Sequence, residues 1–349
     1  MKKRNSKVLI LIIVALFAMA LVAGCGGTDG NNENGNNENG TNNEEVETIV
    51  LKAANSVDMT HPYHLGLVEY GKMIEERTDG KYSLEIFPSA QLGSEREIIE
   101  GVQMGTIDMA VVSTAPLAGF SDAFLVTDLP FMFNDKAHAY KVLDGEIGQD
   151  IFAQIEGTGI KGLAFWENGF RNITNSKGPI NVPADMEGIK IRTMENQIHM
   201  DSFREIGADP TPMAFGELFT ALQQKTVDGQ ENPLPIIATS KFYEVQEHLA
   251  LTGHFYAPAP LLISQATWDK LSDEEKDIFQ QAANEARDIE RQMIQEMDDS
   301  LVAELEAEGM QVTTPDKGPW QEAMAPVYGK YEDRIGKDLI EKIKALGNN

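Results

Sequence analysis

The fold class is decided by residues 48–112, which read TIVLKAANSVDMTHPYHLGLVEYGKMIEERTDGKYSLEIFPSAQLGSEREIIEGVQMGTIDMAVV. Short apolar runs alternate here with stretches of helical periodicity, which predicts strands that alternate with helices. The expected elements are, in order, a strand at 49–53, a helix at 66–77, a strand at 82–87, a helix at 94–104 and a strand at 108–112. This β-α-β-α-β order is the half-unit of a doubly wound parallel sheet, so we predict an α/β fold.

Two polar residues, Ser113 and Thr114, directly follow the third expected strand. In doubly wound sheets, ligands bind beyond the carboxyl ends of the strands, so both residues are candidate ligand contacts. A second set of elements follows, with strands at 163–167 and 189–192 and helices at 197–206 and 215–225. Because one compact core rarely extends over 349 residues, we expect two domains of the same layer type.

A long amphipathic helix is expected in the last third of the chain. Ser272 and Glu275 form a capping-box pattern, which is typical of a helix start, and Gly309 is a typical stop. Between them, apolar residues recur at steps of three or four. At about 1.5 Å per residue the helix would be about 54 Å long, which exceeds the width of one small domain. We therefore expect it to contact both domains.

The first residues have the pattern of an export signal. Basic residues between positions 2 and 7 precede an uninterrupted apolar run at 8–23. The residues Val22-Ala-Gly-Cys25 resemble the bacterial lipobox, in which a signal peptide is removed before a lipidated cysteine. We therefore predict a signal peptide at 1–24 and a lipid anchor at Cys25, diacylglycerol with a further acyl chain such as palmitate, on the outer face of the cytoplasmic membrane. The alternative is an uncleaved membrane anchor in which Cys25 has no role.

Residues 25–47 read CGGTDGNNENGNNENGTNNEEVE and contain two copies of NNENG. Hardly any of these side chains could enter a hydrophobic core, so the segment cannot offset the entropy that ordering it would cost. We predict a flexible tether between the lipid anchor and the folded part of the chain.

Composition excludes several classes of function. The chain has 55 acidic and 29 basic residues, and its net charge of −26 argues against nucleic acid as a partner, because phosphate binding requires clustered cations. A single cysteine excludes an internal disulfide and metal cages built from several thiolates. His61 and His64 lack an obvious third ligand, so we predict no metal site.

Motifs for catalysis or cofactor binding are scarce. The sequence has no G-x-S-x-G motif, no H-E-x-x-H motif and no phosphate-binding P-loop. Gly157-Thr-Gly-Ile-Lys-Gly162 matches the dinucleotide pattern, but it follows a helix and precedes a strand, the reverse of the required order. We predict a helix-to-strand turn at this position, no cofactor and no enzymatic activity.

Two arginines lie among apolar residues and glycines. Arg171 follows the strand expected at 163–167 and a glycine, and Arg192 lies at the end of the strand expected at 189–192. A guanidinium offers a planar pair of donors that matches a carboxylate, and Asn232 could add a neutral amide. Taken alone, an arginine in such a position more often belongs to a structural ion pair than to a ligand site.

Six stretches of the chain resemble a known family. They are PSAQLG at 88–93, LPFMF at 129–133, GFR at 169–171, GIKIR at 188–192, PTPMAFGELFTAL at 210–222 and VDGQENP at 227–233. In this order they resemble the solute-binding proteins of TRAP (tripartite ATP-independent periplasmic) transporters. The resemblance extends from about residue 49 to beyond residue 305, nearly all of the folded part.

The resemblance implies a periplasmic-binding-protein clamp, in which two α/β domains, joined by crossing strands, close on a ligand in the cleft between them. The long helix would be a spine that spans both domains. Domain I would comprise residues 48–168 and 257–296, and domain II residues 169–256 and 297–349. The expected function is capture of a small organic acid and its delivery to the membrane subunits of the permease.

The resemblance also assigns roles to residues. By position, Arg192 matches the principal carboxylate-binding arginine, Arg171 a second arginine, Asn232 an amide contact and Phe215 the aromatic ring against the ligand. Ser113 occupies a position where sialic-acid binders have a glutamate, which favours a simpler acid such as a C4-dicarboxylate, a 2-oxo acid or a sugar acid. We expect the ligand to bridge the two arginines of domain II and Ser113 and Thr114 of domain I.

Two other functions remain as alternatives at this point. A binding lipoprotein of an ATP-driven importer would share the lipid anchor and the two-domain clamp. An exported hydrolase could use the same α/β layers, but it would need a nucleophile beside a base, and the sequence has no recognisable pair.

Overall fold

The computed structural model describes residues 47–347, which belong to one compact unit. The predicted signal peptide, Cys25 and the predicted tether up to residue 46 lie outside the described residues. Within residues 47–347, no helix is both long and apolar enough to cross a membrane. The domain boundaries expected inside the compact unit stay a prediction.

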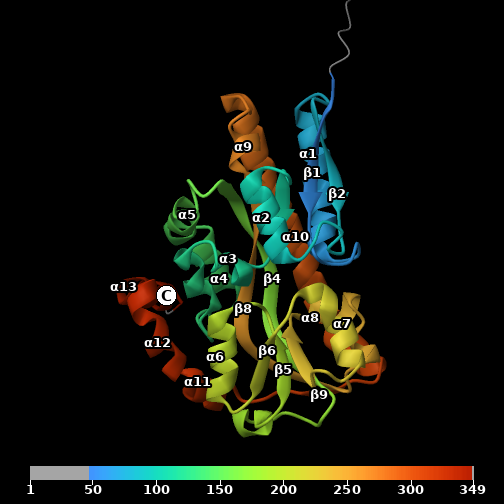
Figure 1. The fold of residues 1–349 in the computed structure, drawn as a ribbon, viewed down its shortest axis with the longest axis vertical. Helices are drawn as coiled ribbons and strands as arrows, with labels where there is room; N and C mark the ends of the chain where they lie inside the picture. Colours follow the sequence, from blue (N-terminus) through green and yellow to red (C-terminus); the bar gives the residue numbers. More distant parts are fainter. Residues whose placement is uncertain (1–46, 348–349) are drawn as a thin grey trace, which may run out of the picture. The chain divides into compact units, whose positions relative to one another are not determined.

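In residues 47–347, one mixed sheet of nine strands forms the framework (Figure 1). Its order is β2-β1-β3-β8-β4-β7-β5-β6, and β9 pairs with β8 outside this path. The strands are β1 (Ile49–Ala54), β2 (Tyr82–Phe87), β3 (Met109–Val111), β4 (Ile160–Asn175), β5 (Lys190–Thr193), β6 (Asp209–Pro212), β7 (Gly229–Asn232), β8 (His248–Ser264) and β9 (Gln311–Thr313). β1 is parallel to β2 and β3, and β5 is parallel to β6 and β7. The predicted α/β class is thus confirmed.

Helices connect and cover these strands. Among the described residues they are α1 (Pro62–Arg77), α2 (Glu95–Met104), α3 (Thr114–Leu117), α4 (Lys136–Leu143), α5 (Glu146–Ala153), α6 (Gln197–Glu205), α7 (Phe215–Gln223), α8 (Leu234–Thr239), α9 (Gln265–Trp268), α10 (Asp273–Ala307), α11 (Lys317–Met324), α12 (Pro326–Ile335) and α13 (Lys337–Leu346). Three 3-10 helices lie at Asp122–Asp128, Pro183–Met186 and Phe242–Glu244. The turn predicted at 157–162 is confirmed, because α5 ends before it and β4 begins within it.

The two longest strands, β4 and β8, connect the two groups of parallel strands (Figure 1). β8 pairs with β3 through residues 261–263 and with β9 through 248–250. β4 pairs with β8 along most of its length and with β7 through 172–175. We call β1–β3 with α1–α5 the first lobe, and β5–β7 with α6–α8 the second lobe. β4 and β8 are the crossing strands that the resemblance led us to expect.

Two sequence predictions were wrong in their boundaries. The first helix begins at Pro62, not at Gly66, because proline is tolerated at the first helical position and His61 caps the helix by accepting a hydrogen bond from the Tyr63 amide at 3.2 Å. The strand predicted at 163–167 continues through Gly169 to Asn175. Gly169 takes a φ of 114° at a register shift of the β4–β8 pairing, so it marks a bulge and not the end of the strand. Arg171 therefore lies inside a strand.

The long helix α10 confirms the capping-box prediction. The Ser272 side chain accepts from the Glu275 amide, and the Glu275 side chain accepts from the Ser272 amide. Along its 35 residues α10 contacts α1 of the first lobe and α8 of the second, together with β4. The expected contact of this helix with both halves of the fold is confirmed.

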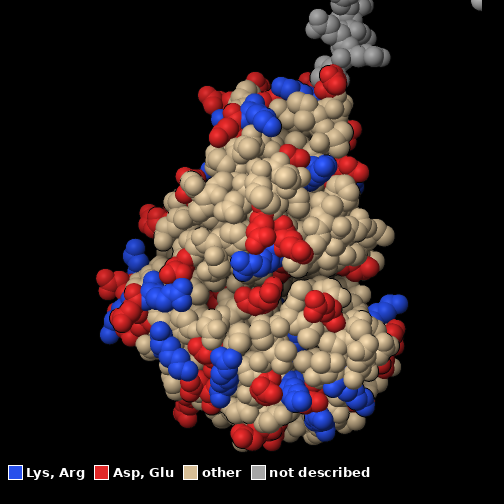
Figure 2. All heavy atoms as spheres, viewed as in Figure 1, with Lys and Arg blue, Asp and Glu red and all other residues tan. Residues whose placement is uncertain are grey.

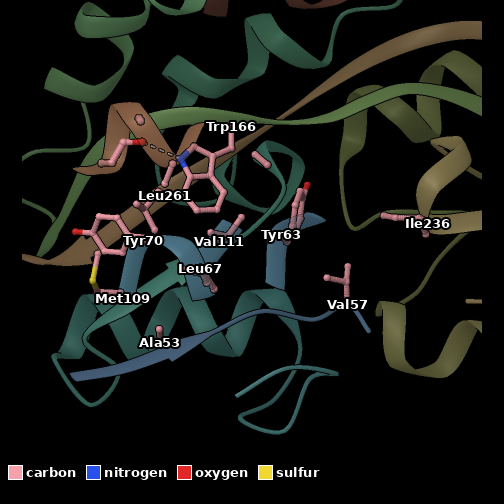
Figure 3. Close-up of a cluster of buried hydrophobic side chains, with 14 of the residues drawn as sticks. Ala53, Val57, Tyr63, Leu67, Tyr70, Met109, Val111, Trp166, Ile236 and Leu261 are labelled. Atoms are coloured by element: carbon pink, nitrogen blue, oxygen red, sulfur yellow. Dashed lines mark hydrogen bonds between the residues drawn. The ribbon is translucent and has the colours of Figure 1, made fainter. Parts of the chain in front are cut away.

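A hydrophobic cluster fixes α1 and α10 against the sheet (Figure 3). Trp166 of β4 is fully buried, and its indole N–H donates to the Ala283 carbonyl of α10 at 3.3 Å. Gly66 of α1 lies so close that a Cβ there would come within 2.7 Å of the Trp166 ring. The cluster thus packs α1 and α10 against β4.

The surface carries both signs of charge. Figure 2 shows basic and acidic side chains interspersed over one face of the molecule, without one continuous basic region. Because charges on an exposed surface are screened over about 8 Å at physiological salt, the net negative charge hardly reaches an enclosed site. An acidic protein of this kind can therefore still bind an anion.

Candidate functional site

A narrow enclosed cavity lies where the strand ends of the two lobes meet. Its side chains nearly fill it, because its volume is only about 10 Å³, and ten residues line it: Ser56, Val57, Tyr63, Glu95, Ser113, Arg192, Met194, Phe215, Asn232 and Ile236. Four of the six residues predicted from the sequence as ligand contacts are therefore together in one cavity. The other two, Arg171 and Thr114, are buried nearby but are not part of the cavity wall.

Arg192 reaches the cavity from β5 of the second lobe and is 2% exposed. Its Nε and Nη2 donate to the Met213 carbonyl at 3.0 and 2.7 Å, which orients the guanidinium. Its Nη1 is buried and has no hydrogen-bond partner, and no carboxylate of the described residues lies within ion-pair distance. Burial, together with the nearby charge of Arg171, lowers the pKa of Arg192 to about 10.

Arg171 has a different environment, although it is as deeply buried. Its Nε and Nη2 donate to the two carboxylate oxygens of Glu231, and Nη2 also donates to the Glu231 carbonyl at 2.6 Å and to Asn232 Oδ1 at 3.1 Å. Only Nη1 has no partner among the described residues. Arg171 Nε and Nη2, which could bind a ligand carboxylate, are thus already bonded to Glu231 of β7.

The Arg171–Glu231 pair is supported by a histidine. Burial alone would raise the pKa of Glu231, but the charge of Arg171 and a hydrogen bond from His254 hold it below its usual range. Burial lowers the pKa of His254, against the pull of Glu231, so its ring is neutral near pH 7. Thr252 Oγ1 lies 2.7 Å from His254 Nδ1, and Nε2 lies 3.3 Å from Glu231 Oε2. The Nε2–H tautomer satisfies both contacts.

Asn232 and Phe215 line the second-lobe side of the cavity. Asn232 ends β7, accepts from Arg171, and donates through Nδ2 to Gln230 Oε1. Phe215 is the first residue of α7, and its ring packs edge-on against Phe242 with a centroid distance of 6.2 Å. Both side chains are therefore held in place by protein contacts before any ligand arrives.

Ser113 is fixed by an acidic residue that the sequence analysis did not identify. The Ser113 amide and hydroxyl donate to Glu95 Oε1 at 3.0 and 3.1 Å, and Ser56 Oγ donates to the same oxygen at 3.3 Å. Asn168 Nδ2 lies 3.5 Å from Ser113 Oγ. The adjacent Thr114 has a buried hydroxyl without a partner in the described structure. The position of Ser113 at a strand end is confirmed, but its side chain is already engaged by Glu95.

Sequence reasoning missed six residues of the cavity wall, of which three are polar: Ser56, Tyr63 and Glu95. Ser56 could have been found, because it follows β1 just as Ser113 follows β3, and the same strand-end rule applies. Glu95 gave no such signal, since an acidic residue in the first turn of a helix is ordinarily exposed and stabilises the helix end. In the structure Glu95 is buried and accepts hydrogen bonds from Ser113 and Ser56.

The described residues contain no group of three or more histidine, cysteine, aspartate or glutamate side chains arranged to hold a metal ion. The chemistry that the cavity supports is recognition of a small anion. It combines a guanidinium that has no carboxylate within ion-pair distance among the described residues, an amide, an aromatic ring, hydroxyl groups and the carboxylate of Glu95 in a narrow space.

Known proteins match this chain over most of its length. Residues 53–334 match the family described as bacterial extracellular solute-binding protein, family 7. A solute-binding protein of Verminephrobacter eiseniae is 45% identical over 79% of this chain and 83% of its own length. The 2,3-diketo-L-gulonate-binding periplasmic protein of Escherichia coli is 38% identical over 83% of this chain and 88% of its own length.

Solved structures agree with the sequence relatives. A TRAP periplasmic solute-binding protein from Polaromonas, bound to D-erythronate, superposes with a TM-score of 0.84 at 45% identity, and the match covers 86% of this chain and 99% of that one. The sugar-acid-binding protein from Advenella mimigardefordensis, in complex with galactonate, gives a TM-score of 0.84 at 35% identity over 87% and 99%. These proteins have the two-domain clamp fold. The chain therefore belongs to the bacterial extracellular solute-binding proteins of family 7, the solute-binding proteins of TRAP transporters, and is a binding protein rather than an enzyme.

Proposed function

We propose that this protein captures a small organic acid in the enclosed cavity and holds its carboxylate on Arg192. The observation that supports this most strongly is the state of Arg192, a buried guanidinium with a free Nη1 and no carboxylate within ion-pair distance among the described residues. A buried charge is costly unless it is paired, and a ligand carboxylate would supply the missing partner. The carbonyl of Met213 keeps the guanidinium oriented for this purpose.

The remaining predicted residues complete the proposed site. Asn232 and Phe215 contact the ligand from the second lobe, and Ser113 contacts it from the first. Arg171 contributes chiefly through its charge and its single free Nη1, because Glu231 occupies the rest of its guanidinium. Thr114 is buried and does not line the cavity, so its proposed contact with the ligand has no support from the cavity lining.

The ligands named for relatives support the class of ligand. Solved relatives hold D-erythronate, galactonate or succinate, each of which has a carboxylate. Binding proteins for sialic acid and for C4-dicarboxylates also match this chain, at 35% and 29% identity. A carboxylate is common to all these acids and can pair with a guanidinium, so in this proposal Arg192 sets the class of ligand and other residues select within it.

A ligand screen tests this function. A bound ligand at 100 times its dissociation constant stabilises a protein by about 2.7 kcal/mol, so a thermal-shift screen of organic acids should reveal the ligands of the parent protein. Arg192→Ala should abolish the shift for every acid that binds. If Arg192→Ala binds the same acids with unchanged affinity in calorimetry, the proposed site is wrong.

The membrane location is also part of the proposal. The lipobox-like residues Val22–Cys25 support lipidation of Cys25 after removal of residues 1–24, with the folded part tethered outside the cytoplasmic membrane and the ligand passed to the TRAP membrane subunits. In cells fed labelled palmitate, the parent should incorporate label and sediment with membranes. Cys25→Ser should do neither, and a labelled Cys25→Ser protein would contradict the proposal.

A further inference from the structure

Polar side chains also join the two lobes directly, outside the cavity wall. Asn196 of the second lobe caps α6, because its Oδ1 accepts from the amides of Ile198 and His199 at 2.9 and 3.1 Å. Its Nδ2 donates to two groups of the first lobe, the Ala115 carbonyl of α3 at 3.0 Å and Asp128 Oδ2 at 2.7 Å. One buried amide thus holds the start of α6 and bonds across to the other lobe.

Asp128 has its side-chain partners on the second lobe. It ends the 3-10 helix that follows α3 in the chain, and it is 3% exposed. Within residues 47–347 its carboxylate pairs with no lysine or arginine. The Asn196 amide donates to it, and His199 Nε2 lies 3.4 Å from its Oδ1. Because a buried carboxylate requires partners, Asp128 depends on the second lobe whenever it is shielded from water.

This contact spans the same gap as the cavity. Ala115 lies two residues after Ser113 and Asn196 two residues after Met194, and both Ser113 and Met194 line the cavity. The two segments follow the carboxyl ends of β3 and β5, where the lobes face each other. Beside them, Ile198 of α6 packs into the hydrophobic cluster that contains α2 and the 3-10 helix of the first lobe. The lobes are therefore joined right next to the candidate ligand site.

The size of the cavity gives this contact a consequence. A volume of about 10 Å³ holds no more than about one water molecule, so an organic acid cannot enter unless the lobes move apart. A hydrogen bond that spans the gap breaks when they separate and forms again when they close. The bond from Asn196 to Asp128 is a charge-assisted one, which is stronger than a bond between neutral groups.

We propose that Asp128 and Asn196 form a latch that holds the two lobes together over a bound acid and so slows its release. Neither side chain lines the cavity, so the latch acts on closure and not through contact with the ligand. The inference rests on the proposed function, since it assumes that an acid occupies the cavity. A contact made only in the closed form raises affinity by raising the population of that form.

Asn196→Asp tests the latch and keeps the helix cap, because aspartate caps a helix as well as asparagine does. The new carboxylate would face Asp128 and the Ala115 carbonyl, so the closed form loses a hydrogen bond and gains a repulsion. With D-erythronate as the probe, binding by calorimetry should weaken at least about tenfold. Most of the change should be faster dissociation in stopped-flow tryptophan fluorescence.

Two further variants separate the latch from other effects of the added charge. Asp128→Asn combined with Asn196→Asp exchanges donor and acceptor at constant net charge, so affinity should return to within about threefold of the parent. Gln197→Glu adds the same charge at the adjacent exposed position, whose side chain donates to Asp201 on its own helix. It is the matched control for repulsion of an anionic ligand, and its affinity should stay within about twofold of the parent.

Small-angle scattering measures closure itself. At a concentration of D-erythronate that saturates the parent, the parent and the exchanged pair should contract, and Asn196→Asp should contract less. If Asn196→Asp melts as the parent does and keeps the parental affinity and dissociation rate, the inference is wrong. It is equally wrong if the exchanged pair folds but binds as weakly as Asn196→Asp alone.

Failure of the latch and failure of the proposed function give different results. If Arg192→Ala abolishes erythronate binding while Asn196→Asp leaves it unchanged, the carboxylate site stands and only the latch falls. If Arg192→Ala binds erythronate as the parent does, the proposed carboxylate site falls, and the loss and recovery of affinity in the Asp128 and Asn196 variants still decide the latch.

Discussion

Arg171 and Arg192 are both buried, but we predict that replacing Arg171 by methionine mainly lowers stability, whereas replacing Arg192 by methionine mainly weakens ligand binding. Arg171 is paired with Glu231 through both carboxylate oxygens, so Arg171→Met leaves a buried carboxylate whose remaining side-chain contact is His254 at 3.3 Å. Breaking a buried pair from one side typically costs about 3–5 kcal/mol. Arg171→Met should therefore lower the free energy of unfolding by about 3–5 kcal/mol without any ligand present.

Arg192 makes no ion pair with a carboxylate of the described residues, so its replacement leaves no carboxylate unpaired. Arg192→Met loses two hydrogen bonds to the Met213 carbonyl, but it also removes a buried charge that makes no ion pair within the described structure. The first effect costs about 1–3 kcal/mol and the second offsets part of it, so the ligand-free protein should lose no more than about 1–2 kcal/mol. The ligand carboxylate, in contrast, loses its anchor. An arginine–carboxylate attraction of about 4 kcal/mol near 4 Å, reduced by desolvation, predicts at least about 100-fold weaker binding.

Two measurements separate these effects. Urea unfolding of the ligand-free proteins gives the change in the free energy of unfolding, and calorimetry with the acid found in the screen gives the affinity. Arg192→Lys is the control for charge, and it should bind more weakly than the parent, because an ammonium lacks the planar donor pair. The reasoning is refuted if Arg192→Met destabilises the ligand-free protein as much as Arg171→Met does, or if Arg192→Met retains parental affinity.

Three further predictions concern the framework. Ser272→Ala should lower the free energy of unfolding by about 0.5–2 kcal/mol in urea titrations, because α10 loses its cap; no change would contradict the capping box. Gly66→Ala should cost about 1–3 kcal/mol through the clash with Trp166, whereas Gly329→Ala, with open space in α12, should stabilise by about 0.5–1 kcal/mol. Burial raises the pKa of Glu290 well above its usual value. Above about pH 4.3 the folded parent therefore holds a proton that the unfolded chain has lost, and its free energy of unfolding falls as pH rises. The free energy of unfolding of Glu290→Gln, compared with that of the parent, should therefore increase from about pH 4 to pH 7, and a difference that stays constant would contradict the raised pKa.

Much of the framework could be predicted because its signals are local. The alternation that predicts β1, β2 and β3 and the capping box of α10 are relations between residues a few positions apart. The same locality explains the errors. Whether a chain enters a helix at Pro62 or Gly66 depends on the His61 cap, and whether β4 ends at Gly169 depends on its pairing with β8. Pairing partners distant in the chain leave no mark on local periodicity.

In the candidate site, too, local signals could be predicted from the sequence and long-range contacts could not. Sequence by itself determined the α/β class, the family resemblance and the four cavity residues Ser113, Arg192, Phe215 and Asn232, because strand ends and motifs are visible along the chain. Tertiary structure decided what each side chain is free to do. Arg171 meets Glu231, 60 residues away, and Glu95 meets Ser113, 18 residues away, so the first is largely satisfied and the second becomes part of the cavity wall. The availability of a charged group depends on which partners folding brings within hydrogen-bond distance, and only the folded chain specifies those partners.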